Sequence, residues 1–313
     1  MLTPQARGGL SAQVLAALRT GDVAPSLTRV SPDDDADAQI TLWALYEQHY
    51  RGFEDADAAL EWHPTLIALR GGLEEAFVAD LRSRFVPPPA VVPFAESFFA
   101  YVAAFEGPSV ATHVQRRADR DQVLELLRAR SLYQLKEADP TTWTVPRLPA
   151  RPQVALMALQ FDEYGAGDPA RQHARFFARG MEACRLDPTY GAYVDDAPVE
   201  VLAQNNAMSL FGLHRRWRGA AVGHLAAFEA ASSLPSRQMA QGLRRLDLPE
   251  QIAAYYDEHV EADAVHEQLA VREICAPLVE QEPALLEDVF LGAFTCLDLE
   301  ARTARVLLDA WAA

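Results

Sequence analysis

Two histidines and an aspartate recur at helical spacing in the segment YYDEHVEADAVHEQLA, residues 255–270. His259, Asp263 and His266 are separated by four and then three residues. An α-helix turns about 100° per residue, so the three side chains fall on one stripe roughly 60° wide. Imidazole and carboxylate groups on one stripe are a suitable ligand set for iron, manganese or zinc. The solvated face of a charged helix has a similar pattern, so the spacing alone leaves both alternatives open.

A lone carboxylate in the segment AAFEAASS is a second candidate ligand. Glu229 stands there among alanines and Phe228. An unpaired carboxylate in so apolar a setting costs several kcal/mol, unless it stays protonated or meets a cation. Exposure of Glu229 to solvent beside the small alanines is the alternative.

The segment FDEYGAGDPARQH offers a glutamate and a histidine ten residues apart. On one straight helix Glu163 and His173 would be about 80° apart and about 15 Å apart along the axis, too far to share a ligand site. Gly165, Gly167 and Pro169 lie between them and can break and redirect the helix. Both side chains could then reach one centre.

The other polar residues are weaker candidates. Glu137 precedes a proline-containing turn, where a glutamate is ordinarily solvated. The remaining candidates lack ligand spacing, and we expect none of them to bind a metal: Glu47, His49, His63, His214 and His224.

Composition narrows the class of protein. The chain has 313 residues, 50% of them hydrophobic, and a net charge of −16, which argues against nucleic acids and anionic membrane surfaces as partners. No apolar run reaches the roughly 18 residues of a membrane span, and the first residues lack a secretory signal pattern. Cys184, Cys275 and Cys296 are isolated, as expected for small core residues in a reducing compartment. We therefore expect a soluble, cytoplasmic protein.

Helical periodicity runs through almost every long segment and predicts an all-α chain. VPPPAVVP, residues 86–93, cannot be helical throughout, and it separates an N-terminal helical part, residues 1–90, from a larger bundle, residues 91–313. Facing helices of such a bundle can each supply one or two inward ligands. The longest predicted helices cover residues 112–137, 199–233, 248–280 and 282–312, with a separate helix at 236–246.

From about residue 94 onward the chain resembles the haem-oxygenase-like diiron oxidases and oxygenases, which are also described as iron-containing redox enzymes. The resemblance rests on RSLYQLKEADPTTW, FDEYGAGDPARQH, GHLAAFEAASSLPSRQ and YYDEHVEADAVHE. In this family a His-x3-Asp-x2-His element follows a glutamate by about thirty residues, which is the separation of Glu229 and His259. The resemblance implies that the metal ligands are Glu137, Glu163, His173, Glu229, His259, Asp263 and His266.

The same resemblance implies a fold and a chemistry. The fold is a haem-oxygenase-like seven-helix bundle that binds no haem, and residues 1–90 form an N-terminal extension that supports a homodimer in some relatives. Two iron ions bind and reduce O2 and oxidise a small-molecule substrate, with electrons from an external donor. The implied reaction is N-oxygenation, or a related oxidation, of an amine or amino acid in a biosynthetic pathway. The alternative is desaturation or C–C cleavage of a fatty acid or amino acid.

The assignment of ligands to individual irons and the role of a group of arginines are hypotheses. We expect Glu163 to bridge the irons, with His173 and His266 toward one iron and His259 and Asp263 toward the other. The arginines of the segment HRRWR either hold a substrate carboxylate or balance the acidic surface; they are Arg215, Arg216 and Arg218.

Two rivals remain open. One is a non-catalytic helical protein that stores or senses metal. The other is a thiamin-degrading enzyme on the same fold, which needs a cysteine nucleophile, but the three cysteines lack an evident partner base.

Overall fold

The computed structural model describes residues 1–89 and 93–313, leaving out the side chains of residues 261–264. All elements in the described part are helical and no strand occurs among those residues, so the predicted all-α class is confirmed. Among the described residues, none of the helices combines the length and apolar character that a membrane crossing requires.

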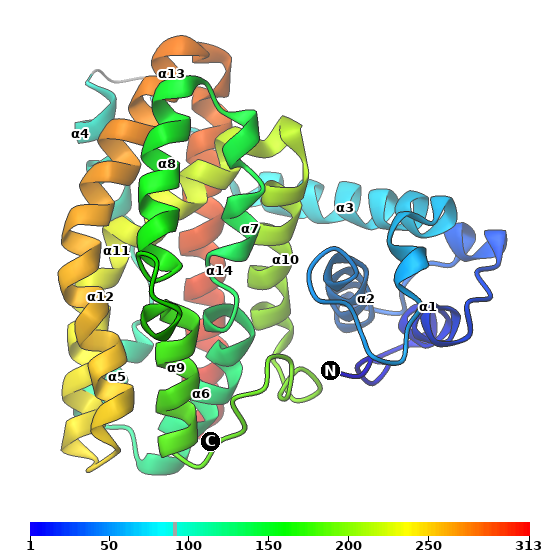
Figure 1. The fold of residues 1–313 in the computed structure, drawn as a ribbon, viewed down its shortest axis with the longest axis horizontal. Coiled ribbons are helices and arrows are strands. Elements are labelled where there is room, and N and C mark those ends of the chain that lie inside the picture. The colour runs from blue at the N-terminus through cyan, green and yellow to red at the C-terminus, as the bar shows by residue number, and fades with distance from the viewer. Residues whose placement is uncertain (90–92) are drawn as a thin grey trace.

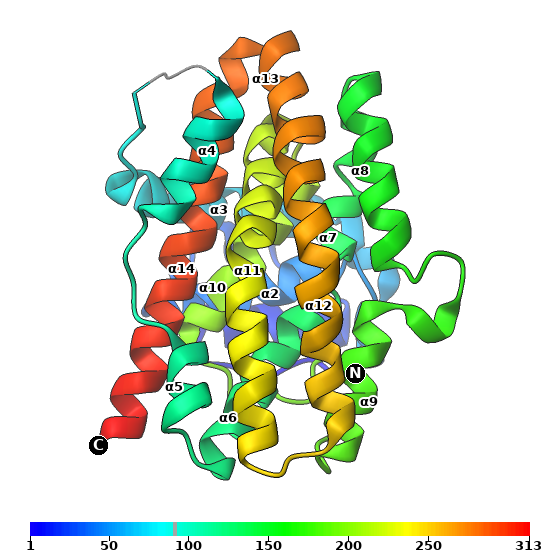
Figure 2. The ribbon, with the colours of Figure 1, turned by 90° about the vertical axis from the view of Figure 1, so that its left-hand side faces the viewer.

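The larger part of the molecule is a bundle of long helices (Figures 1 and 2). At its centre α11 packs against α12 on one side and α14 on the other. The long helices of the bundle are α6 (Arg120–Gln134), α8 (Ala150–Glu163), α9 (His173–Ala183), α10 (Val199–Leu213), α11 (Arg218–Arg245), α12 (Glu250–Gln268) and α14 (Leu286–Ala312). The shorter helices are α4 (Phe94–Ala103), α5 (Val110–Arg116), α7 (Asp139–Thr142) and α13 (Ala276–Gln281).

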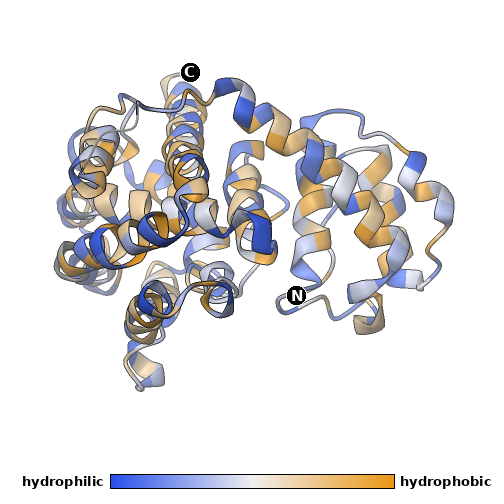
Figure 3. Cartoon of the chain, turned by 90° about the horizontal axis from the view of Figure 1, so that it is seen from above, coloured by the Kyte–Doolittle hydropathy of each residue, from blue (hydrophilic) through white to orange (hydrophobic). Residues whose placement is uncertain are grey.

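Apolar and polar residues occupy different sides of the bundle helices (Figure 3). Burying the apolar sides against one another supplies the main drive for assembly. Two glycines set the spacing between α11 and α14. A Cβ at Gly223 would clash with the carbonyl oxygen of Val289, and one at Gly292 would clash with that of Ala220. Glycine at these two positions therefore lets α11 and α14 approach closely.

The predicted helix at 112–137 is wrong as a single element. It is divided into α5 and α6 because Asp119 begins a new helix. The Asp119 carboxylate accepts a hydrogen bond from the backbone N–H of Gln122, and the Gln122 side chain accepts one from the backbone N–H of Asp119. Such a reciprocal cap satisfies two N–H groups that a helix start leaves unpaired.

The predicted boundaries near α11 are also wrong. The helix expected over 199–233 is interrupted at His214, where the backbone is extended, and α10 and α11 are separate. Conversely, α11 continues through Pro235 to Arg245, although proline removes one helical hydrogen bond. Packing along α12 and α14 holds both sides of Pro235 in line. The helix expected over 248–280 contains a π-helical segment, Leu269–Cys275, that directly follows α12.

An N-terminal lobe lies beside the bundle and consists of α1 (Gly9–Thr20), α2 (Asp35–Glu47) and α3 (Pro64–Arg84) (Figure 1). Glu47 is fully buried at the end of α2, and its Oε2 lies 3.4 Å from Nζ of Lys136 in the bundle. The Tyr190 hydroxyl donates to the same oxygen at 2.8 Å. Burial lowers the pKa of Lys136, while Glu47 acts against that shift. Treating residues 1–90 as a separate domain stays a prediction.

Replacing Glu47 with alanine is expected to destabilise the fold by about 3–5 kcal/mol, because it leaves the Lys136 ammonium buried without its carboxylate. Urea unfolding followed by circular dichroism measures this loss. Glu54→Ala is the matched control, since the Glu54 side chain is 75% exposed and its ion pair is worth less than about 1 kcal/mol. Glu47 is not among the residues that the sequence predicts to bind metal, so the folded variant should keep any metal that the wild type binds. Equal stability of the two variants would contradict this interpretation of Glu47.

Candidate metal centre

The loop between α8 and α9 brings two distant residues together. Gly165 and Gly167 both have φ of 89°, a left-handed conformation that glycine adopts without strain. Helix α8 ends at Glu163 and α9 begins at His173, so the predicted break and redirection of the chain are confirmed. Nδ1 of His173 lies 3.0 Å from Oε2 of Glu163.

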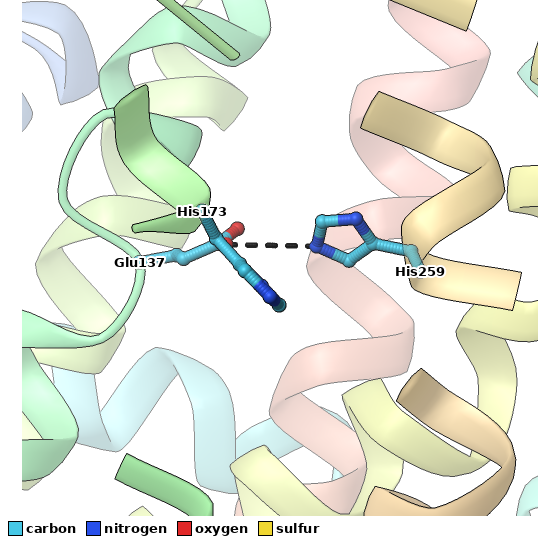
Figure 4. Close-up of side chains that lie close together, drawn as sticks. All are labelled: Glu137, His173 and His259. Atoms are coloured by element: carbon cyan, nitrogen blue, oxygen red, sulfur yellow. Dashed lines mark ion pairs between the residues drawn. The ribbon is translucent and has the colours of Figure 1, made fainter. Parts of the chain in front are cut away.

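A first cluster consists of Glu137, His173 and His259 (Figure 4). The three residues come from the turn after α6, the start of α9 and the middle of α12. Oε1 of Glu137 lies 3.7 Å from Nδ1 of His173 and 3.6 Å from Nε2 of His259. The three side chains are 5–8% exposed, so carboxylate and imidazole groups meet in a nearly dry site.

A second cluster consists of Glu163, Glu229 and His266, all buried. Nδ1 of His266 lies 3.4 Å from Oε1 of Glu163 and 3.7 Å from Oε2 of Glu229. Glu229 is 4% exposed, so the alternative of a solvent-facing carboxylate beside alanines is wrong. Helices α8, α11 and α12 each supply one member of this cluster.

Glu163 joins the two clusters. One of its oxygens approaches His173 of the first cluster, and the other approaches His266 of the second. A carboxylate with one oxygen toward each of two sites has the arrangement of a bridging ligand. The histidines group differently from the sequence-based hypothesis, which paired His173 with His266. Because α9 packs along α12, His173 lies with His259 instead.

Hydrogen bonds outside the clusters orient the imidazole rings. Nδ1 of His259 lies 2.8 Å from the backbone oxygen of Tyr255 and can donate to it, which turns Nε2 toward Glu137. Nε2 of His266 lies 2.9 Å from Oδ2 of Asp162, which turns Nδ1 toward the second cluster. Partners of this kind fix the tautomer and the direction of metal-binding histidines.

The two clusters fit a cation in chemistry and in space. Oε1 of Glu137 and Nδ1 of both His173 and His266 are buried and make no well-aligned hydrogen bond with any described residue. A small cavity of about 20 Å³ lies among Glu137, Glu163, Glu229 and His259. Buried polar atoms that point at a shared space without hydrogen bonds are the arrangement expected of metal ligands.

The charges of the clusters shift their pKa values strongly. Burial alone would lower the pKa of His173, but Glu137 and Glu163 outweigh it and raise the pKa to about 11. Burial likewise lowers the pKa of His266, while Glu229 and Glu163 raise it to about 9. Burial raises the pKa of Glu137, yet His173 and His259 lower it to about 2. In the metal-free protein, imidazolium protons therefore compensate the carboxylates, and a bound cation would replace those protons.

The other predicted candidates lie elsewhere. The side chain of Asp263 is outside the described residues, and its role stays a prediction. His49 pairs with Glu61 and His214 with Glu74, and neither belongs to a candidate metal group among the described residues. The three cysteines are free and buried, as predicted.

A cavity of about 150 Å³ adjoins the first cluster, and His259 and Tyr255 form part of its wall. Most of the wall is apolar, and Arg130 and Glu300 add an ion pair at 2.5 Å. This pair could not be predicted from local spacing, because the two residues are 170 positions apart in the sequence. None of the HRRWR arginines belongs to the described wall, and Arg218 pairs with Glu282 instead.

Comparison with curated proteins finds no significant match. Residues 124–301, more than half of the chain, match the profile of the iron-containing redox enzyme family. Both clusters lie inside the matched region, and the resemblance to this family is confirmed. The chain therefore belongs to the iron-containing redox enzyme family.

Proposed function

We propose that the chain is an O2-activating oxidoreductase that binds two iron ions and oxidises a small molecule. The observation that carries this proposal is the pair of buried clusters that share Glu163. The proposed ligands are the six residues of the two clusters together with Asp263. Four carboxylates balance the charge of two Fe(II) ions, and neutral imidazoles add no charge.

Each residue has a defined part in this proposal. Glu163 would be shared by the two metal positions. Glu137, His173 and His259 would hold one iron, with Asp263 as a further ligand beside His259. Glu229 and His266 would hold the other iron. The Tyr255 hydroxyl lies 3.3 Å from Oε2 of Glu137 and donates to it, which steadies the carboxylate.

Two Fe(II) ions, when bound, supply the electrons that begin the reduction of O2. The protein contributes a dry site, since the cluster side chains are at most 10% exposed. Exclusion of water protects the reaction from side reactions and strengthens electrostatic contacts. The adjoining cavity supplies the place for the substrate next to His259.

We propose N-oxygenation, or a related oxidation, of an amine or amino acid in a biosynthetic pathway. In N-oxygenation one oxygen atom of O2 enters the N–H bond and the other leaves as water. This balance requires two electrons and two protons from outside, and therefore an external electron donor. The apolar wall of the cavity favours a second candidate, desaturation or C–C cleavage of a fatty acid or amino acid.

The test is anaerobic loading with Fe(II), followed by rapid mixing with O2 in the presence of amines, amino acids or fatty acids. We expect O2 consumption that requires about two irons per chain and that one class of compound accelerates. His259→Ala should abolish this consumption and keep the helical circular dichroism signal. His113→Ala, a partly buried histidine outside both clusters, is the control and should retain it. A folded wild-type protein that binds no iron and consumes no O2 would instead favour a non-catalytic helical protein.

A further inference from the structure

The cavity beside His259 has a charged end and a dry end. Among the described residues of its wall, Arg130 and Glu300 carry the permanent charges, and their side chains are 25% and 43% exposed. The His259 side chain, in contrast, is 8% exposed. The ion pair therefore marks the mouth of the cavity, and the metal ligand marks its buried end. A charged group of a substrate loses less hydration at the mouth than beside His259.

The groups at the mouth have unused hydrogen-bonding capacity. Arg130 donates from Nη2 to Glu300, and a guanidinium has five N–H donors, so the partly exposed end of Arg130 keeps further donors. Glu300 accepts from Arg130 and from Gln204, and a carboxylate has about four acceptor sites. Donors of Arg130 and acceptor sites of Glu300 thus remain available at the mouth of the cavity.

We propose that this mouth binds the zwitterionic head of an α-amino acid, with its carboxylate on Arg130 and its ammonium on Glu300. The inference rests on the second candidate of the proposed function, desaturation or C–C cleavage of an amino acid, and specifies how that substrate is held. A ligand with only a negative charge would be repelled by Glu300 at the mouth, and a ligand with only a positive charge would be repelled by Arg130. A zwitterion complements both charges, since guanidinium pairs with carboxylate and carboxylate with ammonium.

This orientation turns the amino acid's side chain, and not its α-amino group, toward the metal ligands. The apolar part of the wall includes Met208, Phe228 and Met239. Phe228 also lines the small cavity among the metal ligands, so the two spaces adjoin there. A cavity of about 150 Å³ accommodates a group of the size of benzene. The fitting substrates are therefore amino acids with an aromatic or branched apolar side chain.

Anaerobic calorimetry on the iron-loaded protein tests the inference without turnover. Each probe set consists of an amino acid, the acid that lacks its amino group and the amine that lacks its carboxylate. The first set is L-phenylalanine, phenylpropanoate and phenethylamine, and the second is L-leucine, isocaproate and isoamylamine. We expect one amino acid to bind at least about tenfold more tightly than both of its singly charged analogues. Arg130→Gln should weaken binding of the amino acid and the acid but not of the amine. Glu300→Gln should weaken binding of the amino acid and the amine but not of the acid.

Arg272→Gln is the matched control, because it breaks an exposed ion pair with Glu96 on the outside of the bundle. It should leave all the affinities unchanged, and unfolding midpoints show whether each variant is folded. Analogues that bind as tightly as the amino acids, or no binding of any probe, would overturn the inference. Amino acid binding without O2 consumption would refute the proposed function alone. Rapid oxidation of a singly charged substrate would refute only the zwitterion site.

Discussion

Replacing Glu163 with alanine is expected to abolish metal binding at both proposed iron positions. Oε2 of Glu163 lies 3.0 Å from Nδ1 of His173, and Oε1 lies 3.4 Å from Nδ1 of His266, so the substitution takes a carboxylate from both clusters. Loss of a residue that only orients a ligand already costs about 10–100-fold in metal affinity. Loss of a shared ligand should cost at least about 100-fold at each position. Iron per chain, measured after anaerobic loading and dialysis, reports the effect.

Glu182→Ala is the matched control, because Glu182 is an exposed glutamate on α9. It should retain the iron content of the wild type, and circular dichroism should show that both variants are helical. Retention of both irons by Glu163→Ala would contradict the ligand assignment. Loss of one iron, with tight binding of the other, would leave a metal site but refute the bridge.

Binding of Fe(II) at pH 7 is expected to release protons from His173 and His266. Their pKa values in the metal-free protein are about 11 and about 9, so both imidazoles are protonated at pH 7. An imidazole nitrogen must lose its proton before it binds a metal, and iron affinity should therefore rise with pH between about 6.5 and 8.5. Calorimetry in buffers of different ionisation enthalpy measures the released protons. No proton release would contradict protonation of the clusters.

The same pKa shifts predict how pH affects the stability of the metal-free protein. The raised pKa values of His173 and His266 stabilise the fold fully below pH 6.5. This stabilisation is lost as the pH rises through about 9 and then about 11. The lowered pKa of Glu137 contributes stability above 4.5, which is lost as the pH falls toward about 2. The contribution of these three groups to the stability of the metal-free protein is therefore largest between pH 4.5 and 6.5. Metal-free protein that gains stability from pH 6.5 to 9 would contradict this linkage.

Local patterns predicted the helices but not all of their ends. Apolar periodicity is a property of neighbouring residues, and it was sufficient for the all-α class. The break at Asp119 depends on a cap that competes with continuation of the helix, and periodicity does not register it. At Pro235 the local signal favours a break, but packing of α11 against α12 and α14 overrides it.

The candidate site could be predicted where its geometry follows from local sequence. Gly165 and Gly167 predicted that the chain turns back between Glu163 and His173, and it does. The grouping of His173 with His259 depends on the packing of α9 along α12, which no spacing encodes. Contacts between distant helices, such as Arg130 with Glu300, are equally invisible to a search for motifs.

The two proposed iron positions can be located directly by X-ray diffraction from crystals loaded anaerobically with Fe(II), with data collected at the iron absorption edge. We expect two anomalous peaks, one among Glu137, His173 and His259 and the other among Glu163, Glu229 and His266, with the Glu163 carboxylate between them. A single peak, or peaks remote from these six side chains in loaded crystals, would contradict the two-iron centre.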